Sequence, residues 1–259
     1  MIDNNSIFPL ILSSIAGLST VLGTLIIFIT KKNDNKILTF ALGFSGGVML
    51  TVSLTNLFPT AEAAISKYHG SALGILWSLF FLLIGALISY LIDIFIPTEE
   101  KGVIPQNKNN SELFRLGLVS TIALMIHNFP EGIATFVSGY QDISLGITVT
   151  FAIALHNIPE GIAIAVPIYY ATKSYYQAIK YSFISGLAEP LGAFIAFLFL
   201  KPFINELILG IIFAIVSGIM LYISLNELIP SSRKYNHPNL SIFSILLGII
   251  IIPLSPIFF

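Results

Sequence analysis

Two short segments of nearly the same sequence combine a histidine, an asparagine, a proline and a glutamate in apolar surroundings. The first, HNFPEG, covers residues 127–132, and the second, HNIPEG, covers residues 156–161. Imidazole nitrogens and carboxylate oxygens suit borderline divalent cations such as Zn²⁺, Fe²⁺, Mn²⁺ and Co²⁺. The duplication of these side chains therefore predicts a site for such metal ions, and we call the two segments the HNxPEG motifs.

The spacing within each motif brings its polar side chains together on a helix. His127 and Glu131 are four residues apart and point only about 40° apart around the helix axis. Asn128 lies about 60° to the other side of Glu131, so the glutamate stands between the other two. The second motif repeats this arrangement with His156, Asn157 and Glu160. If the two faces meet, their histidines and glutamates converge with the asparagines beside them, and a two-metal centre that shares the glutamates is sterically reasonable.

The prolines and glycines of the motifs favour an opened, closely packed helix pair. Pro130 and Pro159 lack a backbone donor and push on the carbonyl four residues earlier, which predicts a kink in each helix. In lipid, such a kink is tolerated where the backbone faces protein or a water-filled cavity. Gly132 and Gly161 are expected to allow close helix contacts.

The elements that must position the motifs are membrane-spanning helices. The chain has 259 residues, of which 56% are apolar and only 10% are charged, whereas a soluble domain is about one quarter charged. The apolar blocks reach the roughly 20 residues that a helix needs to cross a bilayer. With no cysteine, thiolate metal sites and disulfides are excluded. We predict an all-α integral membrane protein, formed by residues 1–259 as a single transmembrane domain.

Polar and Gly/Pro punctuation divides the chain into eight predicted spans. They cover about residues 6–30, 37–61, 71–96, 113–139, 144–170, 176–200, 205–230 and 240–258. The polar connection 97–112 is predicted to be a cytoplasmic loop.

The basic residues predict the orientation of these spans. Ten of the twelve lysines and arginines follow the odd-numbered spans, and only Lys67 and Lys201 fall on the other side. By the positive-inside rule the ten mark the cytoplasm. A multi-pass protein of the cell membrane with both termini outside is therefore expected. Aromatic residues such as Trp77 and Tyr169 are interpreted as facing lipid or the membrane interface.

The two motifs lie on the fourth and fifth spans, which cross the membrane in opposite directions. The motifs are then related by a pseudo-twofold axis in the membrane plane, an arrangement typical of inverted-repeat transporters. Both fall near the middle of their spans, so the metal site is predicted near the bilayer midplane, between helices four and five.

Three further polar residues lie within the spans. Glu189, in GLAEP on span six, is a candidate ligand for a second metal or a proton acceptor, and the alternative is a structural partner for a hydroxyl group. Asn56 and Glu227, in TNLFP and NELIP, form a weaker echo at opposite membrane sides. They are interpreted as lining an entrance and an exit, or equally as interfacial helix caps.

Paired HNxPEG motifs on spans four and five, with GLAEP on span six and NELIP on span seven, resemble the ZIP (Zrt/Irt-like) divalent-metal transporters. The bacterial ZupT- or GufA-like branch is nearest, because both motifs begin with histidine. The resemblance implies a binuclear transport site, uptake of metal into the cytoplasm, an elevator-like or rocking movement between helix bundles, and dimerisation. One metal position would be lined by His127, Glu131, His156 and Glu160, and the other by Asn128, Asn157 and Glu189, with the two motif glutamates bridging.

The chain departs from the family pattern in two places. Many members carry an acidic residue or histidine in the span-two segment, where this chain has Asn56 and Thr60. The 97–112 segment contains no histidine, unlike the His-rich loop of many eukaryotic members.

Other functions compete with divalent-metal transport, for which zinc is the leading substrate and iron, manganese, cobalt and cadmium are alternatives. A membrane-embedded metal-dependent enzyme, either a hydrolase or a di-iron oxidase, would also use histidine and glutamate. The chain lacks the HExxH motif of zinc proteases and the Glu-x-x-His pairs of di-iron bundles. A third function, a metal-free proton or sodium antiporter, has little use for paired histidines. A purely structural role, in which the motif side chains only hold helices together, would require four ionisable groups that are costly to place in a membrane. No catalytic residue and no cofactor are expected.

Overall fold

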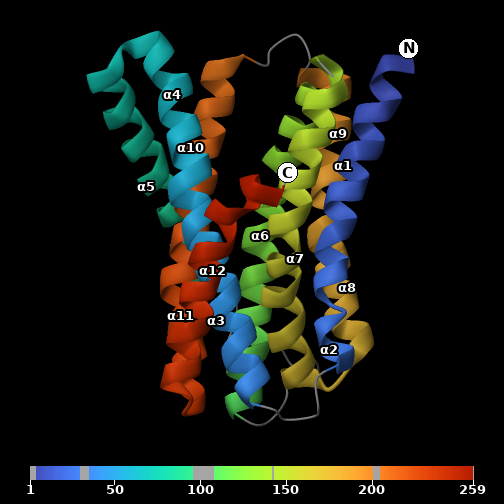
Figure 1. Ribbon diagram of the computed structural model, residues 1–259, viewed down its shortest axis with the longest axis vertical. Helices are drawn as coiled ribbons and strands as arrows, with labels where there is room; N and C mark the ends of the chain where they lie inside the picture. Colours follow the sequence, from blue (N-terminus) through green and yellow to red (C-terminus); the bar gives the residue numbers. More distant parts are fainter. Residues whose placement is uncertain (1–3, 30–34, 96–107, 142, 201–204, 259) are drawn as a thin grey trace.

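The structure, a computed structural model, describes residues 4–29, 35–95, 108–141, 143–200 and 205–258 (Figure 1). These residues contain helices and no strand, which confirms the all-α prediction. The helices are α1 (Asn4–Gly23), α2 (Ile26–Ile29), α3 (Asn35–Val52), α4 (Phe58–His69), α5 (Ser71–Phe95), α6 (Lys108–Gln141), α7 (Ile143–Thr172), α8 (Tyr175–Gly186), α9 (Ala188–Ile195), α10 (Glu206–Tyr222), α11 (Ile229–Ser232) and α12 (Pro238–Phe258). Shorter turns are η1 (Ser53–Leu57), η2 (Ala196–Leu200), η3 (Ile223–Leu228) and η4 (Arg233–Tyr235).

Several of these helices have the length and hydropathy of membrane spans. Five helical stretches among the described residues qualify: Asn35–His69, Ser71–Phe95, Asn110–Tyr140, Tyr175–Phe199 and Glu206–Arg233. Two shorter apolar helices cover Ile7–Gly23 and Pro238–Leu254, and α7 contributes 30 further helical residues. The prediction of a multi-span helical protein is therefore confirmed, while the crossing of the membrane by eight helices stays a prediction.

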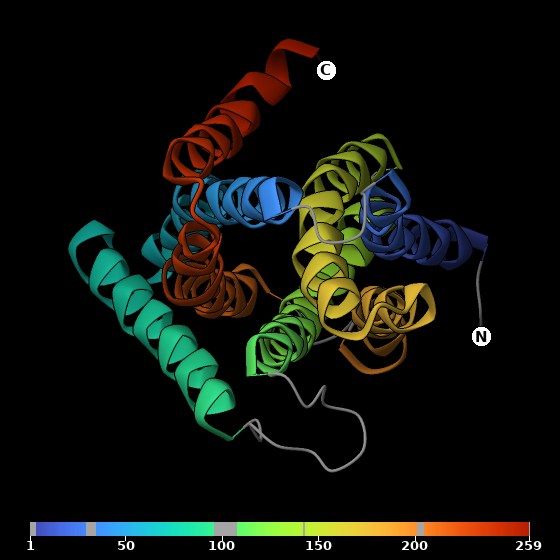
Figure 2. The ribbon, with the colours of Figure 1, turned by 90° about the horizontal axis from the view of Figure 1, so that it is seen from below.

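The helices form two groups that lie side by side (Figure 2). The first contains α1, α2, α6, α7, α8, α9 and η2, and because it carries both HNxPEG motifs we call it the motif bundle. The second, the flanking bundle, contains α3, η1, α4, α5, α10, η3, α11 and α12. The main meeting of the bundles is between α3 and α7, with smaller contacts of α6 with α10 and α5.

Two spans of the flanking bundle contain a π-helical turn just before a proline. In η1 the N–H of Phe58 donates to the carbonyl of Ser53, and in η3 the N–H of Ile229 donates to the carbonyl of Ser224. Each bond spans five residues, one more than in an α-helix. Proline then stands at the start of α4 and α11, where its missing N–H costs no helical bond. The related segments SLTNLFP and SLNELIP thus adopt the same local geometry.

Helix boundaries differ from the predicted spans at two places. The second span was predicted to end at residue 61, but α4 continues to His69 and stops only at Gly70, whose positive φ of 76° suits glycine. Of the predicted loop 97–112, residues 97–107 lie outside the described part of the chain and residues 108–112 begin α6. Polar residues can start a helix there because water satisfies its free N–H groups.

Glycines bring the helices of the motif bundle into backbone contact. A Cβ atom added at Gly132 in α6 would clash with the backbone carbonyl of Glu189 in α9. One added at Gly161 in α7 would clash with the carbonyl of Thr20 in α1. The predicted close contacts at both motif glycines are confirmed, and they hold α9 and α1 directly against the two motif helices.

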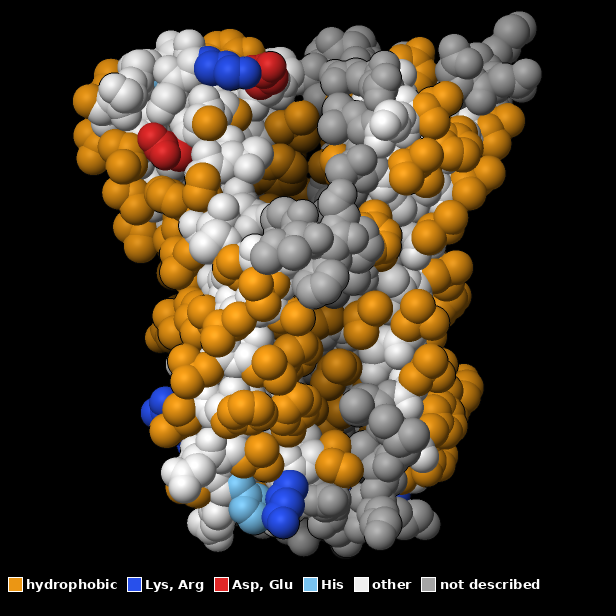
Figure 3. Space-filling model, viewed as in Figure 1, with side chains coloured by type: hydrophobic (Ala, Val, Ile, Leu, Met, Phe, Trp, Pro, Cys, Tyr) orange, Lys and Arg blue, Asp and Glu red, His pale blue; other side chains and the backbone are white. Residues whose placement is uncertain are grey.

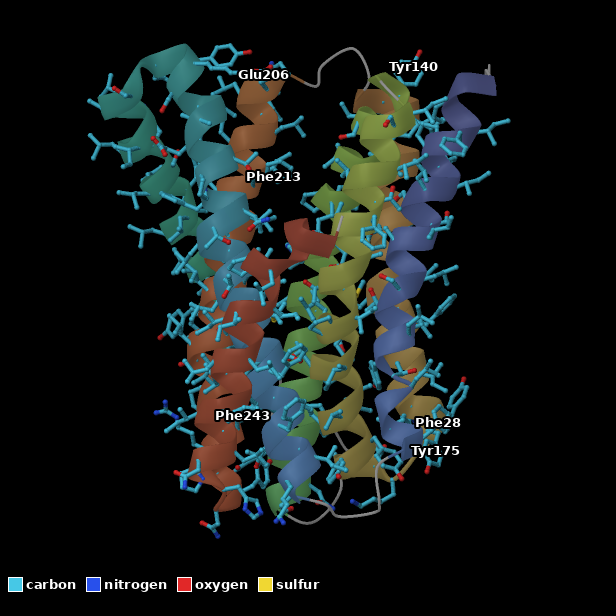
Figure 4. The ribbon with its side chains drawn as sticks, viewed as in Figure 1. Phe28, Tyr140, Tyr175, Glu206, Phe213 and Phe243 are labelled. Atoms are coloured by element: carbon cyan, nitrogen blue, oxygen red, sulfur yellow. The ribbon has the colours of Figure 1, made fainter. Side chains whose placement is uncertain are left out.

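Apolar side chains cover most of the visible outer surface, with charged side chains toward its two ends (Figure 3). Phe28 and Tyr175 stack near the lower end of the motif bundle, with ring centroids 4.8 Å apart (Figure 4). At the upper end of the molecule lie Tyr140 of the motif bundle and Glu206 of the flanking bundle. The interpretation of Tyr169 as facing lipid is wrong, because it is fully buried and stacks on Tyr175. The stretch YYATKSYY at the turn between α7 and α8 brings these rings together.

Candidate metal centre

The first HNxPEG motif meets the second through a buried histidine. His127 in α6 places its Nε2 atom 3.1 Å from Oε1 of Glu131 on the same helix. The same nitrogen lies 3.1 Å from Oε1 of Glu160 on α7. All three side chains are shielded from the surroundings by protein. Both helices continue through Pro130 and Pro159. In the first motif this continuity keeps the four-residue spacing that sets His127 against Glu131.

Asn128 contacts the other oxygen of the glutamate on α7. With its amide oriented so that the nitrogen faces acceptors, Asn128 donates to Oε2 of Glu160 at 3.2 Å and to the carbonyl of Leu124 at 2.9 Å. Glu160 is therefore contacted on both carboxylate oxygens by residues of α6. This cross-helix contact depends on the opposite directions of the two spans, since only then do the two motif faces meet at one level.

A second polar cluster joins α7 to α9 and α1. Asn157 donates to a carboxylate oxygen of Glu189 and, at 3.0 Å, to the main-chain carbonyl of Ala16. The amide oxygen of Asn157 and Oε2 of Glu189 are buried acceptors with no hydrogen-bond partner in the described part of the chain. Buried acceptors of this kind call for a donor or a cation. Sequence reasoning missed the Ala16 carbonyl, because every residue carries one and no side chain marks it.

His156 and the two pathway candidates have different outcomes. The backbone of His156 lies in α7, but its side chain falls outside what the structure describes. Asn56 is exposed in η1, where its side-chain oxygen accepts a hydrogen bond from Thr55 at 2.7 Å. Glu227 is half-buried in η3, where it accepts from Asn226 at 3.1 Å. Both belong to the flanking bundle, so they lie apart from the convergence on α6, α7 and α9.

The arrangement can take a cation only after a small rearrangement. Among the side chains that the structure describes, no three His, Asp or Glu residues are already set as a closed metal cage. Instead, His127 directs its nitrogen at Glu131 and Glu160 over hydrogen-bonding distances. Zinc binds nitrogen and oxygen ligands at about 2.0–2.2 Å, so an ion between these groups would replace the contacts that they now make with each other. Three buried glutamates provide the negative charge that attracts it.

Comparisons with known proteins show which family the chain belongs to. A family model described as ZIP Zinc transporter matches residues 5–115 and 106–255. The zinc transporter ZupT of Oceanobacillus iheyensis is 48% identical over 97% of this chain and 98% of its own length. ZupT of Streptococcus mutans is 46% identical over 96% of both proteins, and ZupT of Chlorobaculum parvum is 42% identical over 99% of both. With matches of this identity over almost its entire length, the chain belongs to the ZIP family of zinc transporters.

Proposed function

We propose that the chain carries divalent transition-metal ions, zinc foremost, across the cell membrane into the cytoplasm. Membership of the ZIP family makes it a multi-pass membrane transporter rather than an enzyme, and the metal ion is its substrate rather than a cofactor. A membrane-embedded hydrolase or oxidase finds no support in the family. The names of the relatives favour zinc, and we propose iron, manganese, cobalt and cadmium as further substrates because the same ligand types accept them.

The observation that carries this proposal is the contact of His127 with glutamates of two different helices. Its Nε2 lies 3.1 Å from both Glu131 and Glu160, in a fully buried position. Charged residues inside a membrane cost about 2.5–3.5 kcal/mol each on insertion scales, so they persist chiefly where they have a function. Imidazole and carboxylate in one buried cluster are suited to a divalent ion.

The site is proposed to hold two metal ions. The first position would use His127, Glu131, His156 and Glu160, and the second would use Asn128, Asn157 and Glu189, with Glu131 and Glu160 bridging. Two contacts support this division. Asn128 reaches Glu160, and Asn157 reaches Glu189, so each asparagine already lies beside a carboxylate. The unpaired acceptors of Asn157 and Glu189 are the groups that a second ion would satisfy.

Transport is proposed to follow from movement of the motif bundle against the flanking bundle. The proposed metal ligands all lie on α6, α7 and α9, so the site would move as one unit. A buried hydrogen bond, 2.8 Å long, runs from Ser45 in α3 to the carbonyl of Pro159 in the second motif and so joins the two bundles. This bond would have to break during that movement.

Orientation and assembly complete the proposal. We propose that the end of the molecule drawn lower in Figure 1 faces the cytoplasm and that both termini lie outside. The support is the positive-inside rule, because ten of the twelve basic residues follow the odd-numbered predicted spans. A homodimer also stays a prediction, which mass measurement of the detergent-solubilised protein tests. Asn56 and Glu227 are proposed to line the entrance and the exit.

A flux assay in liposomes tests the proposed function. We expect the purified chain to carry zinc into vesicles that contain a fluorescent zinc indicator, and Glu160→Gln to abolish that flux, because the substitution keeps the shape but removes the charge shared by both motifs. Glu206→Gln is the matched control, since Glu206 is an exposed glutamate at the start of α10. Absence of zinc flux from the unmodified chain, or full flux in Glu160→Gln, would contradict the proposal.

A further inference from the structure

The lower end of α6 is tied to the flanking bundle by an arginine. The Arg115 guanidinium donates through Nη2 both to a carboxylate oxygen of Asp93, near the end of α5, and to the main-chain carbonyl of the same residue. The second carboxylate oxygen of Asp93 accepts from the hydroxyl of Tyr222 in α10 at 3.2 Å. Both oxygens of Asp93 are therefore engaged, one by each bundle.

This ion pair is partly shielded from water. The Asp93 side chain is 15% exposed and that of Arg115 is 27% exposed. A second pair beside it, between Glu112 in α6 and Lys234 in η4, is 3.7 Å long and more than half exposed. Exposed pairs contribute little to stability, whereas a shielded pair with additional hydrogen bonds holds its geometry. Of these two contacts between the bundles, Arg115 and Asp93 form the one suited to holding them together.

The same network continues to the glutamate proposed at the exit. Asn226 in η3 donates to the hydroxyl oxygen of Tyr222 at 3.0 Å and to Oε1 of Glu227 at 3.1 Å. A chain of hydrogen bonds thus runs from Arg115 through Asp93 and Tyr222 to the π-helical turn. Close by, a cavity of about 260 Å³ opens between the bundles, lined among others by Leu116 of α6 and Ser231 of α11.

The upper end provides a comparison. There, Lys67 of α4 pairs with Glu206 of α10 at 2.6 Å, and both residues belong to the flanking bundle. That pair does not cross the boundary between the bundles, so their relative movement leaves it intact. Movement at the lower end, by contrast, must separate Arg115 from Asp93.

We propose that the Arg115–Asp93 pair, held by Tyr222, is a latch that closes the lower end of the transporter and opens once in each transport cycle. The latch rests on the proposed movement of the two bundles. With the latch closed, α6 is held against α5 and α10 and the route from the metal centre toward the lower end is shut. When it opens, water replaces the partners of both charges, and Ser231, which is nearly buried beside the cavity, becomes more accessible from the lower end.

Cross-linking tests whether the latch must open. The chain contains no cysteine, so an introduced pair reacts without background. We expect the double variant Asp93→Cys with Arg115→Cys to lose zinc flux in liposomes when a short bis-methanethiosulfonate joins the two thiols through disulfides. The flux should return when these disulfides are reduced. Lys67→Cys with Glu206→Cys, joined in the same way, is expected to keep its flux. Zinc binding measured by equilibrium dialysis should persist in both linked proteins, which separates a failed latch from a failed metal site.

Thiol labelling provides a readout that needs no transport. Ser231 is nearly buried beside the cavity. We expect Ser231→Cys to react at least about threefold faster with a membrane-impermeant reagent at the lower end when Arg115→Gln is also present, because loss of the latch raises the open population. The same reporter combined with Lys67→Gln should react at the unchanged rate. Equal labelling rates with and without Arg115, or undiminished flux through the linked Asp93–Arg115 protein, would overturn the proposal.

Discussion

At the scale of single residues, Glu160 is the centre of the arrangement. His127 lies beside one of its carboxylate oxygens and Asn128 contacts the other, so two side chains of α6 contact one side chain of α7. A carboxylate in such a position needs either a proton, a hydrogen-bond donor or a metal ion. Asn128 supplies a donor to Oε2, and a divalent ion would supply positive charge beside both oxygens.

Glu189 provides a residue-scale prediction about stoichiometry. Replacement by glutamine keeps a side-chain oxygen that can still accept from Asn157, but removes the negative charge that a second ion needs. We expect zinc bound per chain to fall from two ions to one in Glu189→Gln, as measured by elemental analysis after equilibrium dialysis. Glu206→Gln should retain both ions. Two tightly bound zinc ions in Glu189→Gln would remove this residue from the second position.

The contacts within one motif could be predicted from the sequence, and those of the second cluster only in part. Residues four apart on a helix share a face, which is why His127 was expected beside Glu131. Because neighbouring spans run in opposite directions, the sequence also predicts that Glu160 of the second motif lies close to His127. The main-chain carbonyl of Ala16, which accepts from Asn157, follows only from how α1 packs against α7.

At the scale of elements, glycine sets the distance between α6 and α9. A methyl group at Gly132 would meet the backbone of Glu189, which cannot rotate away as a side chain can. The π-helical turns η1 and η3 are the other local feature of note, because both lie in spans of the flanking bundle that face the motif bundle. The hydrophobic pattern of the sequence does not reveal such turns, since a single wider turn barely changes the spacing of the apolar residues along the helix.

Substitution of Gly132 by alanine tests this packing. We expect the free energy of unfolding to fall by about 1–3 kcal/mol relative to Gly139→Ala, because the added methyl group overpacks the contact with α9. Gly139 is the control on the same helix, since its nearest neighbours are side-chain atoms of Pro9 at 3.3 Å. Both variants gain the same helix propensity, so their difference isolates the clash. Thermal unfolding in detergent measures it, and equal stability of the two variants would argue against the close approach.

At the scale of the whole molecule, the chain separates into a bundle that carries the site and a bundle that flanks it. The doubled motif predicted the helix pair at the centre, but the assignment of the remaining helices to two groups could not be predicted. Spans one and six join the motif bundle through glycine contacts such as that of Gly161 with Thr20, and composition gives no sign of which apolar helix will meet which.

Membrane orientation is the whole-molecule prediction. Lys67 and Lys234 lie at opposite ends, and their side chains are 63% and 59% exposed, so access limits neither. In intact cells, we expect Lys67→Cys to react with a membrane-impermeant maleimide, and Lys234→Cys to react only after the cells are permeabilised. The reverse pattern would place the ten basic residues outside and invert the proposed direction of uptake.

The central claim, that the two HNxPEG motifs hold the transported ion between α6 and α7, is tested most directly by locating zinc itself. Crystals of the zinc-loaded protein, measured at the zinc absorption edge, should show anomalous density within about 2.0–2.2 Å of His127 Nε2 and of oxygens from Glu131 and Glu160. That density should vanish in Glu160→Gln. Zinc density confined to surface histidines such as His69 and His237, with none between the two helices, would contradict the account.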